Sequence, residues 1–260
     1  MQSSNPVLGR AFGNGKRGYA AFDPSSTTTT QADSSQLEDL FNAPAASSLR
    51  TGRMTIDDVV TRTGILFAVL VVTGAGAWTL NFAGGALMVG LLGGFVLAMV
   101  NSFSKTVRPA LIVAYAAFEG VALGTLSHIY NSAYPGIVSQ AVIATLCAFA
   151  GMLFAYRSGK IRVTPKFTRV MLGSLIGYLI LSVVTIFTGF PAGGLGLLIA
   201  VAGVGLASFF LVLDFDQIEK GIAAGAPQQE SWRAAFGLMV TVVWLYLEVL
   251  RLLSILRSND

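Results

Sequence analysis

The sequence predicts an all-α membrane protein with seven transmembrane helices. Apolar residues make up 54% of the 260 residues and charged residues only 12%, about half the charge of an ordinary soluble domain. The apolar residues are gathered into seven stretches, most of them close to the roughly 20 residues needed to cross a bilayer. The connections between these stretches alternate between uncharged and charged, which is typical of loops on opposite sides of a membrane.

Residues 1–54 differ in composition from the transmembrane domain, which we assign to residues 55–260. The stretch from Asp23 to Gln36 is nearly all Ser, Thr, Pro, Ala and Asp, and such a segment buries too little apolar surface to offset its ordering entropy. We therefore expect a disordered cytoplasmic tail. It has no apolar stretch of the length found in secretory signal peptides, so the first helix itself is the expected membrane-targeting signal.

Helix-start and turn signals delimit the seven spans. The first helix is expected to begin at Thr55, because Thr55 and Asp58 have the spacing of a capping box, with acids in the first turn. Turn residues or charges separate the apolar stretches that follow. The predicted spans are Thr63–Leu80, Gly85–Val100, Pro109–Tyr130, Gly136–Tyr156, Val170–Phe187, Gly193–Leu213 and Phe236–Leu256.

The charges of the connections predict the orientation. The first, third and fifth connections are short turns without charge. The second contains Lys105 and Arg108, the fourth contains five basic residues, and the sixth, between Asp214 and Arg233, is mixed. Because basic residues favour the cytoplasmic side, these three connections and the N-terminus are expected in the cytoplasm and the C-terminus outside. Nucleic-acid binding would require a basic face with base-stacking aromatic residues, and the sequence shows neither.

Pairs of glycines four residues apart lie inside three predicted spans. Such pairs let helix backbones approach closely in lipid. General packing within the bundle is the simpler interpretation, and a homodimer face is the alternative. The pairs are Gly90 with Gly94, Gly120 with Gly124, and Gly173 with Gly177.

Three carboxylates, Glu119, Asp214 and Glu248, lie within or directly after apolar spans, where a charge costs about 2.5–3.5 kcal/mol on insertion scales. Such residues are functional candidates, but each also has a structural interpretation. Asp214, Asp216 and Glu219 fit a solvated cytoplasmic helix end. Glu248 fits an ion pair with Arg251 on the same helix face. Glu119 has no evident partner in its own helix, so we expect it to be protonated or to reach another span.

Asp214 and Glu248 would form a carboxyl dyad if the bundle brings them together. Two carboxylates in contact do not easily both ionise, so they share a proton over part of the pH range. Such a dyad would sense pH, and its oxygens would also suit a hard cation such as Ca²⁺.

Three segments resemble the Bax inhibitor family of membrane proteins, whose bacterial members include YccA-like proteins. The end of the sixth span, Leu213–Glu219 (LDFDQIE), is followed about thirty residues later by Leu245–Leu253 (LYLEVLRLL). The third span contributes Phe118–Gly124 (FEGVALG), which fits the family's pattern. The resemblance covers about residues 60–256.

The resemblance implies a central last helix and a pH-dependent calcium leak, with Asp214 and Glu248 as the pH-sensing acids. It implies further that a basic residue paired with the first acid can hold the pore shut. Lys105 and Arg108 are the candidates for that role, and both also fit ordinary cytoplasmic loop charges. Eukaryotic relatives have cell-protective roles, and bacterial relatives are associated with a membrane-embedded ATP-dependent protease. One departure is Glu248, because family members commonly have Asp there.

Other chemistry is poorly supported by the sequence. His128 and Cys147 are the only residues of their types, and one His with one Cys makes neither a zinc site nor a disulfide. The chain also lacks a phosphate-binding loop motif. We therefore expect no enzyme and no cofactor, with Ca²⁺ only as a transported ion or as a ligand of Asp214 and Glu248.

The function predicted from the sequence is a pH-sensitive cation (calcium) leak channel in a bacterial plasma membrane, gated by the carboxyl dyad. A non-conducting regulator that binds a membrane protease or another membrane protein is the first alternative. A proton-coupled transporter is the second, although no internal repeat is evident. Asp214 and Glu248 are the principal site candidates. The additional candidates are Glu119, Asp216, Arg108, Lys105 and Arg251.

Overall fold

A computed structural model describes residues 52–80, 84–189, 191 and 193–258 of the chain. In this part all the regular secondary structure is helical, and seven helices are long and apolar enough to cross a membrane. The predicted fold class is confirmed. The predicted tail lies outside the described residues except for its last three, 52–54. The helices are α4 (Ile56–Thr79), α5 (Gly84–Phe103), α6 (Pro109–Ala133), α7 (Ile137–Arg157), α8 (Pro165–Thr188), α9 (Gly194–Ala223) and α10 (Glu230–Ser258).

Local signals at the helix starts explain where several helices begin. The Thr55 side chain accepts a hydrogen bond from the backbone N–H of Asp58, and the Asp58 side chain accepts one from the backbone N–H of Thr55, so the predicted capping box is confirmed. Pro109 and Pro165 occupy the first turns of α6 and α8, where a missing N–H costs nothing.

Helix α9 continues ten residues beyond the predicted end at Leu213, to Ala223. Its final turns are stabilised by an ion pair between Asp216 and Lys220, which lie one helical turn apart. The Lys220 Nζ atom is 2.6 Å from Asp216 Oδ2. Phe215 in the same segment is buried. The apolar stretch thus marks the length suited to lipid and not the end of the helix.

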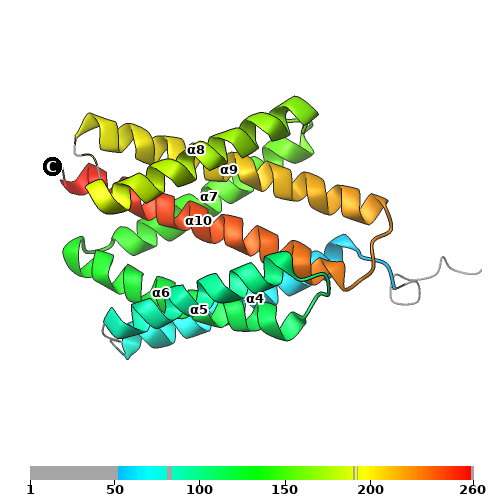
Figure 1. Cartoon of the computed structure of the whole chain (residues 1–260), viewed down its shortest axis with the longest axis horizontal. Coiled ribbons are helices and arrows are strands. Elements are labelled where there is room, and N and C mark those ends of the chain that lie inside the picture. Colours follow the sequence, from blue (N-terminus) through cyan, green and yellow to red (C-terminus); the bar gives the residue numbers. More distant parts are fainter. Residues whose placement is uncertain (1–51, 81–83, 190, 192, 259–260) are drawn as a thin grey trace, which may run out of the picture. The chain divides into compact units, whose positions relative to one another are not determined.

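Helix α10 lies in the middle of the bundle, between α7 and α9 on one side and α4 and α6 on the other (Figure 1). Two apolar cores flank it, one made with α7 and α9 and one with α4 and α6. Helices α5 and α8 are peripheral, packing mainly on α6 and α9 respectively, and both expose many large apolar side chains. The expectation of a central last helix is confirmed.

Two of the three glycine pairs lie where helices touch. A Cβ atom at Gly90 would lie 2.8 Å from the backbone nitrogen of Ala122, so α5 and α6 approach closely there. A Cβ atom at Gly124 would overlap the backbone of Gly74, where α4 crosses α6. Gly173 and Gly177 have no such neighbour. Packing within the bundle therefore accounts for the first two pairs and not for the third.

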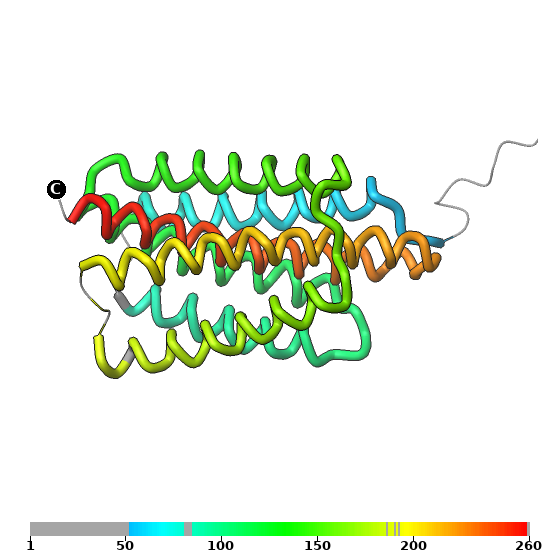
Figure 2. Tube along the Cα trace, turned by 90° about the horizontal axis from the view of Figure 1, so that it is seen from above, coloured from blue at the N-terminus to red at the C-terminus, as the bar shows by residue number. Residues whose placement is uncertain are grey.

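The three connections that carry charge lie at the same end of the helices, together with residues 52–55 (Figure 2). We call this the charged end. The C-terminal turns of α10 lie at the opposite end, where Arg257 donates a 2.7 Å hydrogen bond to the carbonyl of Pro135 in the α6–α7 turn. The alternation of connections read from the sequence thus corresponds to two distinct ends of the bundle.

Candidate functional site

Glu248 is buried in the middle of α10, with 6% of its surface exposed. The indole N–H of Trp244, one turn earlier, donates to Oε1 at 3.2 Å. Arg251, three residues later, donates to Oε2 at 3.4 Å. Because a buried carboxylate is tolerated only when it is paired and hydrogen-bonded, these two partners explain how α10 accommodates Glu248. The sequence suggested an ion pair with Arg251 as a purely structural role for Glu248, and this ion pair is present.

Two further residues complete the surroundings of Glu248 from other helices. The Tyr178 hydroxyl of α8 accepts a 3.2 Å hydrogen bond from Arg251 and is itself hydrogen-bonded to Glu248. A Cβ atom at Gly203 of α9 would meet both the Glu248 carboxylate and the Tyr178 hydroxyl. We call Tyr178, Gly203, Trp244, Glu248 and Arg251 the Glu248 cluster.

Three members of this cluster, Trp244, Tyr178 and Gly203, were not predicted from the sequence. Trp244 could have been found, since its spacing of four residues from Glu248 places both side chains on one helix face. Tyr178 and Gly203 belong to α8 and α9, and no local pattern relates them to Glu248. Their role comes from the packing of three helices.

Asp214 lies on α9 closer to the charged end. Its Oδ2 atom is buried and has no hydrogen-bond partner among the described residues, while Thr241 of α10 provides a side-chain hydrogen bond. An unpartnered buried carboxylate oxygen is costly, so this position calls for a functional explanation. Asp214 also lines a pocket with a volume of about 220 Å³.

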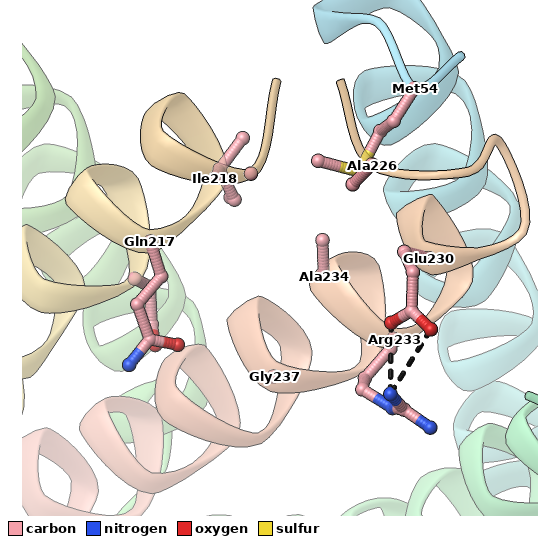
Figure 3. A pocket seen from close by; sticks show the side chains of 10 residues that line it. Met54, Gln217, Ile218, Ala226, Glu230, Arg233, Ala234 and Gly237 are labelled. Carbon is pink, nitrogen blue, oxygen red and sulfur yellow. Dashed lines mark hydrogen bonds and ion pairs between the residues drawn. The ribbon is translucent and has the colours of Figure 1, made fainter. Parts of the chain in front are cut away.

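The pocket lies between the last turns of α9 and the first turns of α10, beneath the segment that precedes α4 (Figure 3). We call it the Asp214 pocket. Its lining combines apolar and small residues with an acid–base pair, Glu230 and Arg233. The lining residues are Met54, Asp214, Gln217, Ile218, Gly221, Ala226, Glu230, Arg233, Ala234 and Gly237.

The structure does not bring Asp214 and Glu248 into contact. Thr241, the partner of Asp214, precedes Glu248 by about two helical turns, roughly 10 Å along α10. Gly203, which faces Glu248, precedes Asp214 by about three turns of α9, roughly 16 Å. The two acids therefore lie along the same α9–α10 interface at different levels, and a Ca²⁺ ion could not bridge them in this arrangement.

Helix geometry explains this separation. Helices α9 and α10 are consecutive, antiparallel and joined by a short connection, so residues at equal distances from the connection lie opposite each other. Asp214 is about two and a half turns from the end of α9, whereas Glu248 is about five turns from the start of α10. The dyad hypothesis assumed a contact that this register does not allow.

Glu119 faces a different part of the bundle. It is hydrogen-bonded to Tyr115, one turn earlier on α6, and a Cβ atom at Gly94 of α5 would lie 2.8 Å from its Oε2 atom. The sequence showed no evident partner for Glu119 within its own helix, and in the structure the Tyr115 hydroxyl fills that role. Glu119 thus lies at the α5–α6 interface, where its neighbours include neither Asp214 nor Glu248.

The other acidic candidates have partners at the charged end. Asp216 is paired with Lys220 as described above, and the exposed Glu219 accepts a hydrogen bond from Tyr156 of α7. This agrees with the structural interpretation of Asp216 as part of a solvated helix end. Among the described residues, no three acidic, His or Cys side chains are grouped so that they could hold a metal ion.

The basic residue that lines the Asp214 pocket is Arg233 of α10, not Lys105 or Arg108. Arg233 pairs with Glu230 at 2.9 Å, as drawn in Figure 3. It also donates to the backbone carbonyls of Ser104, at 3.0 Å, and Lys105, at 3.3 Å. The sequence placed Arg233 in the mixed sixth connection, and only the packing of α10 against the α5–α6 connection reveals its position.

Comparisons with known proteins give one finding. A family model described as Bax inhibitor 1 like matches residues 5–258, nearly the whole chain. A search of curated proteins gives no match.

Proposed function

The chain belongs to the Bax inhibitor 1 like family and is an integral membrane protein, and from this premise we propose that it is a pH-sensitive cation leak channel with calcium as a permeant ion. The observation that carries the proposal is the placement of two acids along one helix interface. Asp214 lines a pocket at the charged end, and Glu248 lies deeper, on the central helix. Ionisable groups inside a membrane bundle commonly mark an ion path.

The two acids take different roles in this proposal. Arg251 balances the charge of Glu248, so the Glu248 cluster acts as the barrier in the middle of the path. Asp214 has no ion pair among the described residues and keeps one buried oxygen unpartnered. Its ionisation would place an uncompensated charge in the pocket, which attracts cations and loosens the α9–α10 contact. We therefore propose Asp214 as the pH sensor, separate from Glu248, in place of a dyad in contact.

The direction of opening follows from this charge. At low pH the protonated Asp214 leaves the pocket neutral and the path closed. At higher pH the ionised carboxylate favours cation entry. The basic connections favour a cytoplasmic charged end and an outer C-terminus, so the Asp214 pocket would open toward the cytoplasm.

Calcium flux into liposomes that contain the purified protein tests the proposal, measured across roughly pH 6 to 8, where carboxylates in apolar sites can titrate. Wild type should show flux that rises with pH. Asp214→Asn should lose this pH dependence, because an amide cannot ionise. Glu248→Gln should change the size of the flux and retain its pH dependence, which separates this proposal from a dyad.

No flux above that of protein-free liposomes at any pH would contradict the channel. That result would favour the alternative from the sequence, a non-conducting regulator that binds a membrane protease or another membrane protein. If Glu248→Gln alone removed the pH dependence, the sensor would be Glu248 and the division of roles proposed here would be wrong.

A further inference from the structure

Met54, in the segment directly before α4, lines the Asp214 pocket at the charged end. Only 4% of its surface is exposed, although it lies outside the helix, two residues before the start of α4. Figure 3 shows its side chain extending over the pocket beside Ala226, opposite the side chains contributed by α9 and α10. A buried, flexible thioether side chain is well suited to fill an irregular gap.

We propose that Met54 is a removable stopper of the Asp214 pocket, so that the segment before α4 controls access of aqueous ions to Asp214. The inference rests on the proposed function in one respect, namely that the pocket is the mouth of the ion path. Whether Met54 blocks access to the pocket can be tested without measuring ion conduction.

Among the described residues, the backbone of residues 52–54 is attached to the α9–α10 connection by a short pairing. The N–H of Met54 donates to the carbonyl of Ala226, and the N–H of Gln228 donates to the carbonyl of Gly52, both at 2.8 Å. Arg53 and Pro227 form the isolated antiparallel bridge between these bonds. Since single hydrogen bonds add little net stability, this pairing can be released without disturbing a helix.

The pocket provides a seat for the methionine. A Cβ atom at Gly221 of α9 would lie 2.9 Å from the terminal methyl carbon of Met54, so glycine at this position leaves the space that the side chain fills. A larger residue at position 221 would force the end of the Met54 side chain to shift. Gly221 is therefore a second position from which the stopper can be tested.

The α9–α10 connection has other attachments to α4. The side-chain amide of Gln228 donates to Asp58 at 2.8 Å, and Arg62 donates to the Gln228 carbonyl. These bonds do not involve Met54. Its truncation should therefore open the pocket and leave the connection attached to the bundle.

The first test measures access to the pocket by the labelling rate of a cysteine at Ala234, which lines the pocket on α10, with a charged, water-soluble thiol reagent. Cys147, which is exposed, is replaced by serine in every variant. Labelling should be at least about tenfold faster with Met54→Ala than with Met54, because exposing a buried methionine side chain is costly enough to suppress opening by such a factor. Gly221→Ala should also accelerate labelling.

Two controls define the result. Met54→Leu keeps a side chain of similar volume and should label as slowly as the protein with Met54. A cysteine at Ser158, which is exposed after α7 at the same end, should label at one rate in all variants. Equal labelling of position 234 with Met54, Met54→Ala and Gly221→Ala would overturn the proposal.

The second test locks the stopper. Cysteines at positions 53 and 227 replace the bridge partners, whose Cα separation in an antiparallel pair suits a disulfide. Calcium flux into liposomes should be low with the disulfide formed and should rise on addition of a reductant, whereas the protein with Arg53 and Pro227 should not respond. Equal flux in the oxidised and reduced states would contradict gating by this segment.

The two tests separate the stopper from the channel. Faster labelling in Met54→Ala without flux from any variant would support the stopper and refute the proposed function. Flux that follows pH with unchanged labelling would support the channel and refute the stopper.

Discussion

Thr241 of α10 is the hydrogen-bond partner of Asp214, and it lies about two turns before Glu248 on the same helix. This relationship assigns the two acids to different levels of the α9–α10 interface. Asp214 is associated with a pocket at the charged end, and Glu248 with a buried ion pair between three helices. Substitutions at the two positions should consequently have separable effects.

The ion pair between Glu248 and Arg251 should be important for stability. We expect Arg251→Met to lower the free energy of unfolding by about 3 kcal/mol, because Glu248 would keep a buried charge without its cationic partner. The double variant Arg251→Met with Glu248→Gln should lose less than the sum of the two single variants. Unfolding of the purified protein in detergent, followed by circular dichroism, gives these values. Strict additivity would show that the pair contributes no coupling.

The absence of a side chain at Gly203 should be important for stability. Gly203→Ala places a methyl group against the Glu248 carboxylate and the Tyr178 hydroxyl, and such overpacking costs about 1–3 kcal/mol. Gly205, two residues later on α9, has open space around it. Gly205→Ala is therefore the matched control, expected to be neutral or slightly stabilising because alanine favours helix. A similar loss of thermal stability in both variants would contradict the close contact at Gly203.

Arg233, and not Arg108, should hold the charged end closed. Arg233→Gln removes the ion pair with Glu230 and weakens the bonds to the Ser104 and Lys105 carbonyls, so we expect a larger calcium leak at low pH. Arg108→Gln should leave the leak unchanged, because Arg108 does not line the Asp214 pocket. Flux into liposomes at low pH compares the two variants. The reverse order of effects would restore Arg108 as the closing residue.

Glu119 should be dispensable for pH sensing. Its contacts are Tyr115 on its own helix and Gly94 on α5, away from the α9–α10 interface. Glu119→Gln keeps the shape and hydrogen-bonding capacity of the side chain, and we expect flux to keep the pH dependence of wild type. Loss of the dependence in this variant would place Glu119 in the ion path and would require a second route along α6.

Several features could be predicted from the sequence because local patterns determine them. The length of the apolar stretches predicted seven spans, and the alternation of charge predicted which connections share one end of the bundle. The capping box at Thr55 depends on residues only three positions apart. The motifs around Asp214 and Glu248 predicted the family, which the match over residues 5–258 confirms.

Contacts between distant segments were decided only by the tertiary structure. Apolar periodicity indicates that α9 and α10 are helices, but the register between them follows from side-chain packing and from the length of their connection. That register separates Asp214 from Glu248. It also brings Gly203 to Glu248, while the packing of α8 brings Tyr178 there. The fold of the charged end places Met54 in the Asp214 pocket. The sequence by itself determined which acids lie in the membrane spans, and packing between helices determined what each of them touches.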